Sequence, residues 1–118
     1  MLTVQIYSSR LLTSTMSGTL NVRLAREFLS HLDRWVKLGG TQLLAFHDWE
    51  AVEDYETDAR NVLTPWSKLH RPQFDRVHML VRSRTLAWGI SIVNSITNDV
   101  MIAHHSRAAF DQARRAAL

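Results

Sequence analysis

The sequence of 118 residues contains no cysteine, which excludes a disulfide framework, a thiolate zinc site and a cysteine nucleophile. It has no apolar run near the roughly 20 residues that cross a membrane. Residues 1–20 hold too much Ser and Thr for a signal peptide, and repeats and linkers are absent. These absences favour one cytoplasmic domain over residues 1–118, a length that can bury a core without cross-links.

Motifs of catalysis and metal binding are also lacking. Histidines and carboxylates occur, but not at the HExxH spacing of a zinc site. Ser83 and Ser106 lie in no Gly-x-Ser-x-Gly elbow that would make either one a nucleophile. We therefore expect a protein that is not an enzyme and that holds neither a metal nor a cofactor.

Charge is distributed unevenly, although the net charge is only +3. Residues 48–58 hold six of the eleven acids and no Lys or Arg, whereas residues 59–118 hold nine bases and three acids. We expect an acidic loop over residues 48–58, which is either an interaction surface or a solvated segment. Nucleic-acid binding is the least favoured reading, because the bases form no run and these acids would repel phosphates.

The apolar run at residues 43–46 predicts a central strand that is buried on both faces and stops at His47. The segments before it predict a hairpin of strands 2–6 and 10–16 ended by Gly18, then a helix over 20–38 capped by Asn21 or Thr19. After it we expect a helix over 55–69 that is broken at Pro65, followed by a strand at 77–81. The next helix should be capped by Thr85 and end at Asn98 and Asp99, and a short strand at 100–103 should follow it. The last helix should be capped by Ser106, with Phe110, Ala113 and Ala117 on its inner face. This order predicts an α/β domain with a mixed sheet of about five strands, the first antiparallel, and four main helices.

Polar side chains follow the predicted parallel strands, and the carboxyl ends of such strands usually form the ligand-binding edge. We expect one edge to gather these residues: His47, Asp48, Trp49, Arg82, Arg84, His104 and His105. Two guanidinium groups at a helix start suit phosphate or carboxylate. Trp49 either covers a pocket, anchors a partner or packs in the core, since indoles are favoured in all three places.

Three features resemble the STAS and SpoIIAA-like superfamily of anti-sigma-factor-antagonist type. They are the turn at residues 18–21 (Gly-Thr-Leu-Asn), a following strand that ends in Asp48, and the complete element order. In antagonists of this type an Asp-Ser pair, eight and nine residues after that acid, carries a phosphorylated serine. The matching positions here are Glu56 and Thr57, so Thr57 is a possible phosphoacceptor or an ordinary first-turn residue.

Two functions remain open from the sequence. The first is a non-enzymatic regulatory domain that binds a protein partner, or a second copy of itself, through the edge with Trp49 and the acidic loop. The alternative is a binder of a small anionic or lipid-like molecule near Arg82, Arg84 and the histidines. Lipid enters only through the resemblance, since wider relatives of the SpoIIAA-like fold include lipid binders.

Overall fold

The computed structural model describes residues 1–118 and contains the nine predicted elements in the predicted order, with one added 3-10 turn. The strands are β1 (Leu2–Ile6), β2 (Leu11–Leu20), β3 (Leu43–Tyr55), β4 (Phe74–Val81) and β5 (Met101–His104). The helices are α1 (Val22–Val36), α2 (Thr57–His70), α3 (Arg84–Thr97) and α4 (Arg107–Ala117), with the 3-10 turn η1 at Arg71–Gln73. None of these helices combines the length and the hydropathy that crossing a membrane requires.

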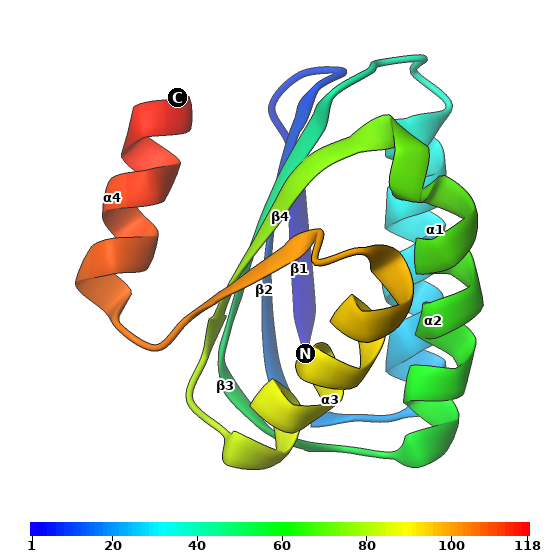
Figure 1. The fold of residues 1–118 in the computed structure, drawn as a ribbon, viewed down its shortest axis with the longest axis vertical. Helices are drawn as coiled ribbons and strands as arrows, with labels where there is room; N and C mark the ends of the chain where they lie inside the picture. The colour runs from blue at the N-terminus through cyan, green and yellow to red at the C-terminus, as the bar shows by residue number, and fades with distance from the viewer.

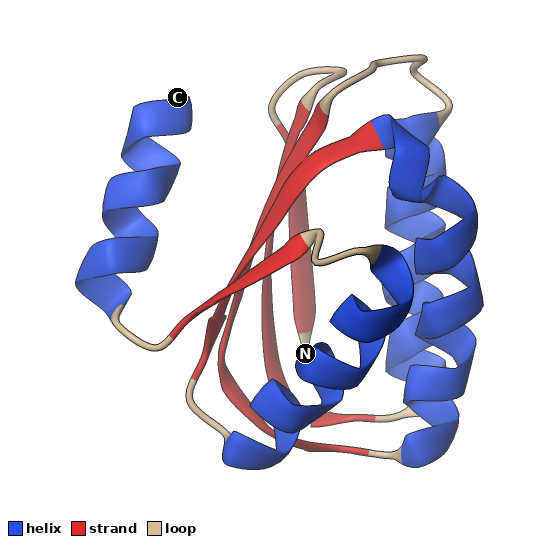
Figure 2. Ribbon diagram, viewed as in Figure 1, coloured by secondary structure: helices blue, strands red, loops and turns tan.

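One sheet of five strands organises the molecule in the order β1-β2-β3-β4-β5. β1 pairs with β2 antiparallel, and all other neighbours are parallel. Helices α1, α2 and α3 cover one face, whereas α4 lies alone on the other (Figure 1, Figure 2). The predicted fold class and the central place of β3 are therefore confirmed.

The main core fills the space between the sheet and helices α1 to α3. On α1 the predicted apolar stripe is buried against the sheet, and Trp35 at its end is fully buried. Asn21 caps this helix as predicted, because its side-chain oxygen accepts a hydrogen bond from the backbone amide of Leu24 at 2.8 Å.

A smaller core joins α4 to the opposite face of the sheet. Its buried residues are Phe46 of β3, Leu80 of β4 and Phe110 of α4. Ala113 and Ala117 pack against this cluster, so the predicted inner face of the last helix is confirmed. Ser106 also caps α4 as predicted, through the amide of Ala109.

Two predicted interruptions are wrong. β2 does not end at Gly18, which instead adopts a left-handed φ of +88° inside the strand, next to a register shift against β3. Helix α2 is not broken at Pro65. The next residue, Trp66, donates its indole N–H to Asp33 of α1 at 2.7 Å, so packing against α1 holds the turn that proline weakens.

The start of α3 also differs from the prediction. Ser83, not Thr85, caps this helix by accepting a hydrogen bond from the amide of Leu86 at 3.2 Å. Ser83 follows β4 directly and has the extended backbone of an N-cap, which leaves Thr85 inside the first turn. At its other end the helix closes on Asn98, as predicted, and Asn98 adopts the left-handed conformation.

Candidate functional site

Strand β3 does not stop at His47 but continues for eight more residues to Tyr55. It continues because β2 runs beside it, with Ser17 paired to Ala51 and Leu20 paired to Tyr55. The predicted acidic loop at residues 48–58 is therefore wrong: most of this segment is a strand, and the rest is the start of α2. Hydrogen bonding to β2 outweighs the low strand propensity of its acidic residues.

The predicted site residues of β3 lie beside the carboxyl ends of β4 and β5, but the predicted set does not form one site. Asp48 of β3 pairs with Leu80 of β4, and Leu80 pairs with His104 of β5. Successive residues of a strand point to opposite faces, so Asp48 lies on the α4 side while His47 and Trp49 lie on the other. The sheet itself separates these side chains.

Trp49 is a core residue in this fold. Its side chain is 4% exposed and its ring packs edge-on against Phe28 of α1, with centroids 5.1 Å apart. It cannot anchor a partner from that position, so the packing alternative holds, although its side chain also lines a pocket beneath the helices. The cause is the extension of β3, which places Trp49 in mid-strand beneath the helices.

Buried beside Trp49 is a short relay of polar groups that spans β2 and β3. The indole N–H of Trp49 donates to Ser14 Oγ at 3.2 Å, and Ser14 Oγ lies 2.6 Å from Nδ1 of His47. Ser14 and His47 are each 4% exposed. The alternation of Leu12, Ser14 and Met16 was a signal that sequence reasoning missed, since period two places Ser14 on the buried face.

Burial lowers the pKa of His47 from 6.5 to about 3, because the low-dielectric interior disfavours the charged imidazolium. His47 is therefore neutral at physiological pH. A general base works best with a pKa near the operating pH, so this Ser-His pair lacks the base that an activated serine requires.

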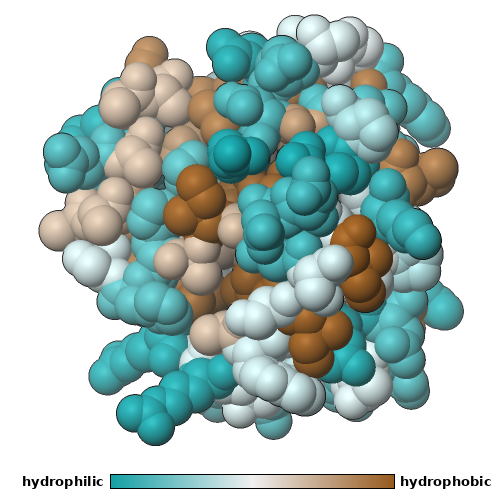
Figure 3. All heavy atoms as spheres, viewed as in Figure 1, coloured by the Kyte–Doolittle hydropathy of each residue, from teal (hydrophilic) through white to brown (hydrophobic).

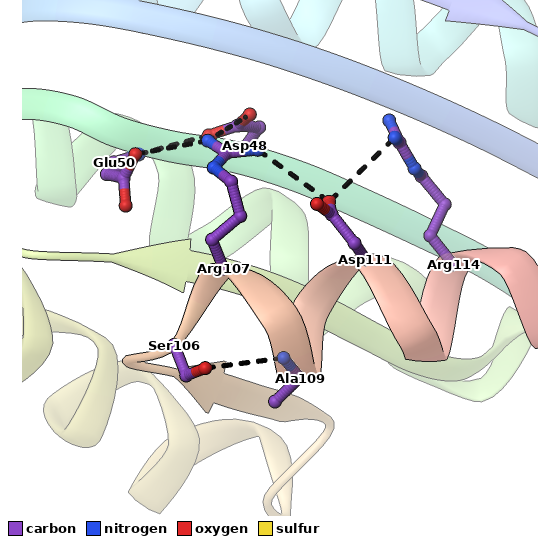
Figure 4. A network of polar contacts seen from close by, with 7 residues as sticks. All are labelled: Asp48, Glu50, Ser106, Arg107, Ala109, Asp111 and Arg114. Carbon is purple, nitrogen blue, oxygen red and sulfur yellow. Dashed lines mark hydrogen bonds and ion pairs between the residues drawn. The ribbon is translucent and has the colours of Figure 1, made fainter.

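On the other face, Asp48 takes part in an ion-pair cluster that fastens the start of α4 to β3 (Figure 4). Arg107 bonds Asp48 at 2.9 Å and Glu50 at 3.1 Å, and lies 3.6 Å from Asp111. The hydrogen bond to Asp48, followed by that to Glu50, raises the pKa of Arg107 above its ordinary value. With its charge neutralised in this way, Asp48 serves to dock α4.

Histidines of β4 and β5 form a second pair on the α4 side. His78 Nδ1 lies 2.9 Å from His104 Nε2, and the two rings continue a stack that starts at Phe46. Burial lowers the pKa of both, and the neighbouring charges of His104 on His78 and of His105 on His104 lower them further. His105 itself is exposed. No three histidine or carboxylate side chains gather as a metal site.

The start of α3 presents the remaining predicted residues. Arg82 and Arg84 are exposed and form no ion pair. One turn further along the helix stands Trp88, which is 63% exposed. Trp88 was not among the predicted site residues, although its position two residues after buried Leu86 places it opposite the inner stripe.

Trp88 begins an exposed apolar ridge on the outer side of α3. Ile92 is half-buried and Ile96 is 45% exposed, each one helical turn beyond the last. Figure 3, which has α3 in front, shows hydrophobic side chains at the surface over this helix. We call Trp88, Ile92 and Ile96 the α3 ridge.

Thr57 is the first residue of α2 and is exposed. Its neighbours Glu56 and Asp58 are exposed too, and no side chain caps this helix. The position is accessible to a modifying enzyme, while the two carboxylates would repel an added phosphate. Both alternatives for Thr57, a phosphoacceptor and an ordinary first-turn residue, stay predictions.

Two solved structures share this architecture. An uncharacterized protein of the DUF3478 family from Shewanella loihica, described as SpoIIAA-like in fold, superposes with a TM-score of 0.70 at 14% identity, covering 95% of this chain and 92% of that one. The unphosphorylated anti-sigma factor antagonist SpoIIAA superposes with a TM-score of 0.68 at 10% identity, covering 97% and 98%. No protein-family model matches the sequence, and neither does a curated protein. The resemblance predicted from the sequence is thus confirmed at the level of architecture: the chain has a SpoIIAA-like fold.

Proposed function

We propose that the chain is a non-enzymatic regulatory domain that binds a protein partner through the α3 ridge and the adjoining carboxyl ends of β4 and β5. The likeness in fold to an anti-sigma factor antagonist supports a regulatory role. In this proposal the binding edge keeps the exposed residues Arg82, Arg84 and His105 of the predicted set, whereas the side chain of His104 packs on the α4 side. Trp88 takes the anchoring role first given to Trp49.

The observation that carries the proposal is the exposure of Trp88. A side chain of this size is normally buried at least in part, and tryptophan is among the residues most enriched at the energetic centres of interfaces. Two further apolar side chains continue from it along α3, whereas Arg82 and Arg84 lie at its start. An apolar centre with a charged rim is the usual anatomy of a protein interface.

Affinity capture from the source cell with purified wild type and Trp88→Ala tests this function. Trp88→Ala should fold normally, since exposed substitutions usually change stability by less than about 0.5 kcal/mol. Loss of an interface anchor commonly costs about 2 kcal/mol or more of binding free energy, so the affinity for the captured partner should fall about thirtyfold or more. Tyr7→Ala is the matched control, because Tyr7 is an aromatic side chain that is 46% exposed just after β1, the edge strand opposite β5.

The same preparations separate the alternatives. Light scattering on a sizing column reports whether the ridge joins two copies of the chain, which Trp88→Ala would dissociate. Arg84→Ala should have little effect on either form of association. If Arg84→Ala abolishes binding of a co-purifying anion while Trp88→Ala changes nothing, the small-anion alternative replaces the proposal.

A further inference from the structure

A cavity that is partly open to solvent lies between the sheet and helices α1, α2 and α3. Its volume is about 110 Å³, and 16 of its 21 lining residues are hydrophobic. Its walls include Phe28, Leu63, Trp66, Met79, Ile90 and Val93. An apolar cavity of about 150 Å³ in another protein admits benzene, so the volume here is in the size range of a small ring compound.

In the wall of the cavity, α3 and the end of β3 approach each other closely at Gly89 and Tyr55. A Cβ on Gly89 would lie 2.8 Å from ring atoms of Tyr55, so only glycine lets this tyrosine stand against the helix. The Tyr55 hydroxyl accepts a hydrogen bond from Arg60 at 3.2 Å. Arg71 is likewise occupied, since it donates to the carbonyls of Thr97 and Phe74.

His47 contributes a further polar group to the wall. The relay described above assigns the hydrogens: the Trp49 indole can only donate to Ser14, and Ser14 satisfies its own hydrogen only by donating to Nδ1 of His47. Neutral His47 therefore carries its proton on Nε2, and this N–H forms no hydrogen bond within the protein. His47 lines the cavity and Ser14 does not, so the Nε2 side of the ring faces the open space.

A ligand that enters the pocket displaces water from around this donor, and an acceptor on the ligand then supplies the partner that the donor needs. We propose that the cavity binds a small neutral apolar molecule that carries one carbonyl oxygen, which accepts a hydrogen bond from His47 Nε2–H. A carboxylate is the competing ligand, because Arg60 and Arg71 of the wall form no ion pair, whereas neutral His47 favours the uncharged carbonyl. This inference goes beyond the proposed function: the site lies under the inner side of α3, whereas the ridge is on its outer side.

Two probes of the same shape test the hydrogen bond, cyclohexanone and methylenecyclohexane, which differ only in a carbonyl oxygen against a methylene group. Titrations are followed by NMR of the imidazole nitrogens and the Trp49 indole. Both probes should bind saturably, with the ketone tighter by about two- to tenfold, as one hydrogen bond provides. The Nε2 signal should shift with the ketone only, and His47→Phe should abolish the difference between the two probes.

The location is tested by filling the cavity. Ser67 on α2 lines it and bonds the carbonyl of Leu63 four residues back, while exposed Ser91 on α3 makes the same kind of bond to Ala87. Ser67→Leu should block both probes, and Ser91→Leu should block neither. This pair of variants keeps the test valid even if His47→Phe does not fold.

Several results would overturn the proposal. One is the absence of saturable binding, and another is equal affinity for both probes in the wild type. A proton on Nδ1 instead of Nε2 in the free protein would remove the donor. Undiminished binding in Ser67→Leu would place the site elsewhere, and tighter binding of hexanoate than of cyclohexanone would replace the neutral ligand with an acid.

Discussion

Acidification should destabilise the fold through His47, and the size of the effect follows from its burial. The pKa of His47 falls from 6.5 in the unfolded chain to about 3 in the folded protein. Between these values the unfolded chain binds one more proton than the folded one, so each unit of falling pH costs about 1.4 kcal/mol of unfolding free energy. The stabilisation is complete above pH 6.5 and is lost progressively toward about pH 3.

From about pH 7 to about pH 4.5, this single group should remove about 2.5 kcal/mol, a large share of the stability of a small domain. The lowered pKa values of His78 and His104 act in the same direction, so the whole loss in the wild type exceeds the part due to His47. Comparison with a variant that lacks only His47 isolates its share.

Urea unfolding followed by tryptophan fluorescence at both pH values, on wild type and His47→Asn, measures this share. The asparagine oxygen can still accept the Ser14 hydroxyl proton, although the smaller side chain lowers stability at neutral pH. Its further loss on acidification should be smaller than that of the wild type by about 2.5 kcal/mol. His31→Gln, a histidine substitution on α1, is the control and should keep the wild-type difference. Equal losses in wild type and His47→Asn would refute the reasoning.

The docking of α4 gives a second prediction: Phe110→Ala should cost about 3 kcal/mol or more, because Phe110 is the only fully buried side chain of this helix. Arg107→Ala should cost less than about 1 kcal/mol and lose its effect at high salt, since its ion pairs are exposed. Urea unfolding compares the two, and a larger loss for the arginine variant would contradict this order. Phosphopeptide mass spectrometry of the protein from its source cell should find Thr57 mostly unmodified because of its acidic neighbours, and a largely phosphorylated population would show that a kinase overcomes them.

Local chemistry made most elements predictable from the sequence. Asn21 and Ser106 act as caps because their side-chain oxygens reach the free amides of the first turn, a contact within a few residues. The apolar spacing of α1 and the inner face of α4 likewise required nothing beyond the helical period. From these elements, the order of alternating strands and helices led directly to the mixed sheet.

The candidate site was less predictable, because each of its features depends on a distant partner. Trp49 and the acids after it belong to a strand only because β2 extends to Leu20 beside them. Asp48 was expected at an open edge, but Arg107, which is 59 residues away in the chain, neutralises it. The sequence therefore determined where helices begin, which faces are apolar and how the elements follow one another, since these depend on contacts between near neighbours. Only the tertiary structure decided where β3 ends, that Trp49 is buried and Trp88 exposed, and that His47 lines a cavity, because pairing and packing between distant segments outweigh local propensity.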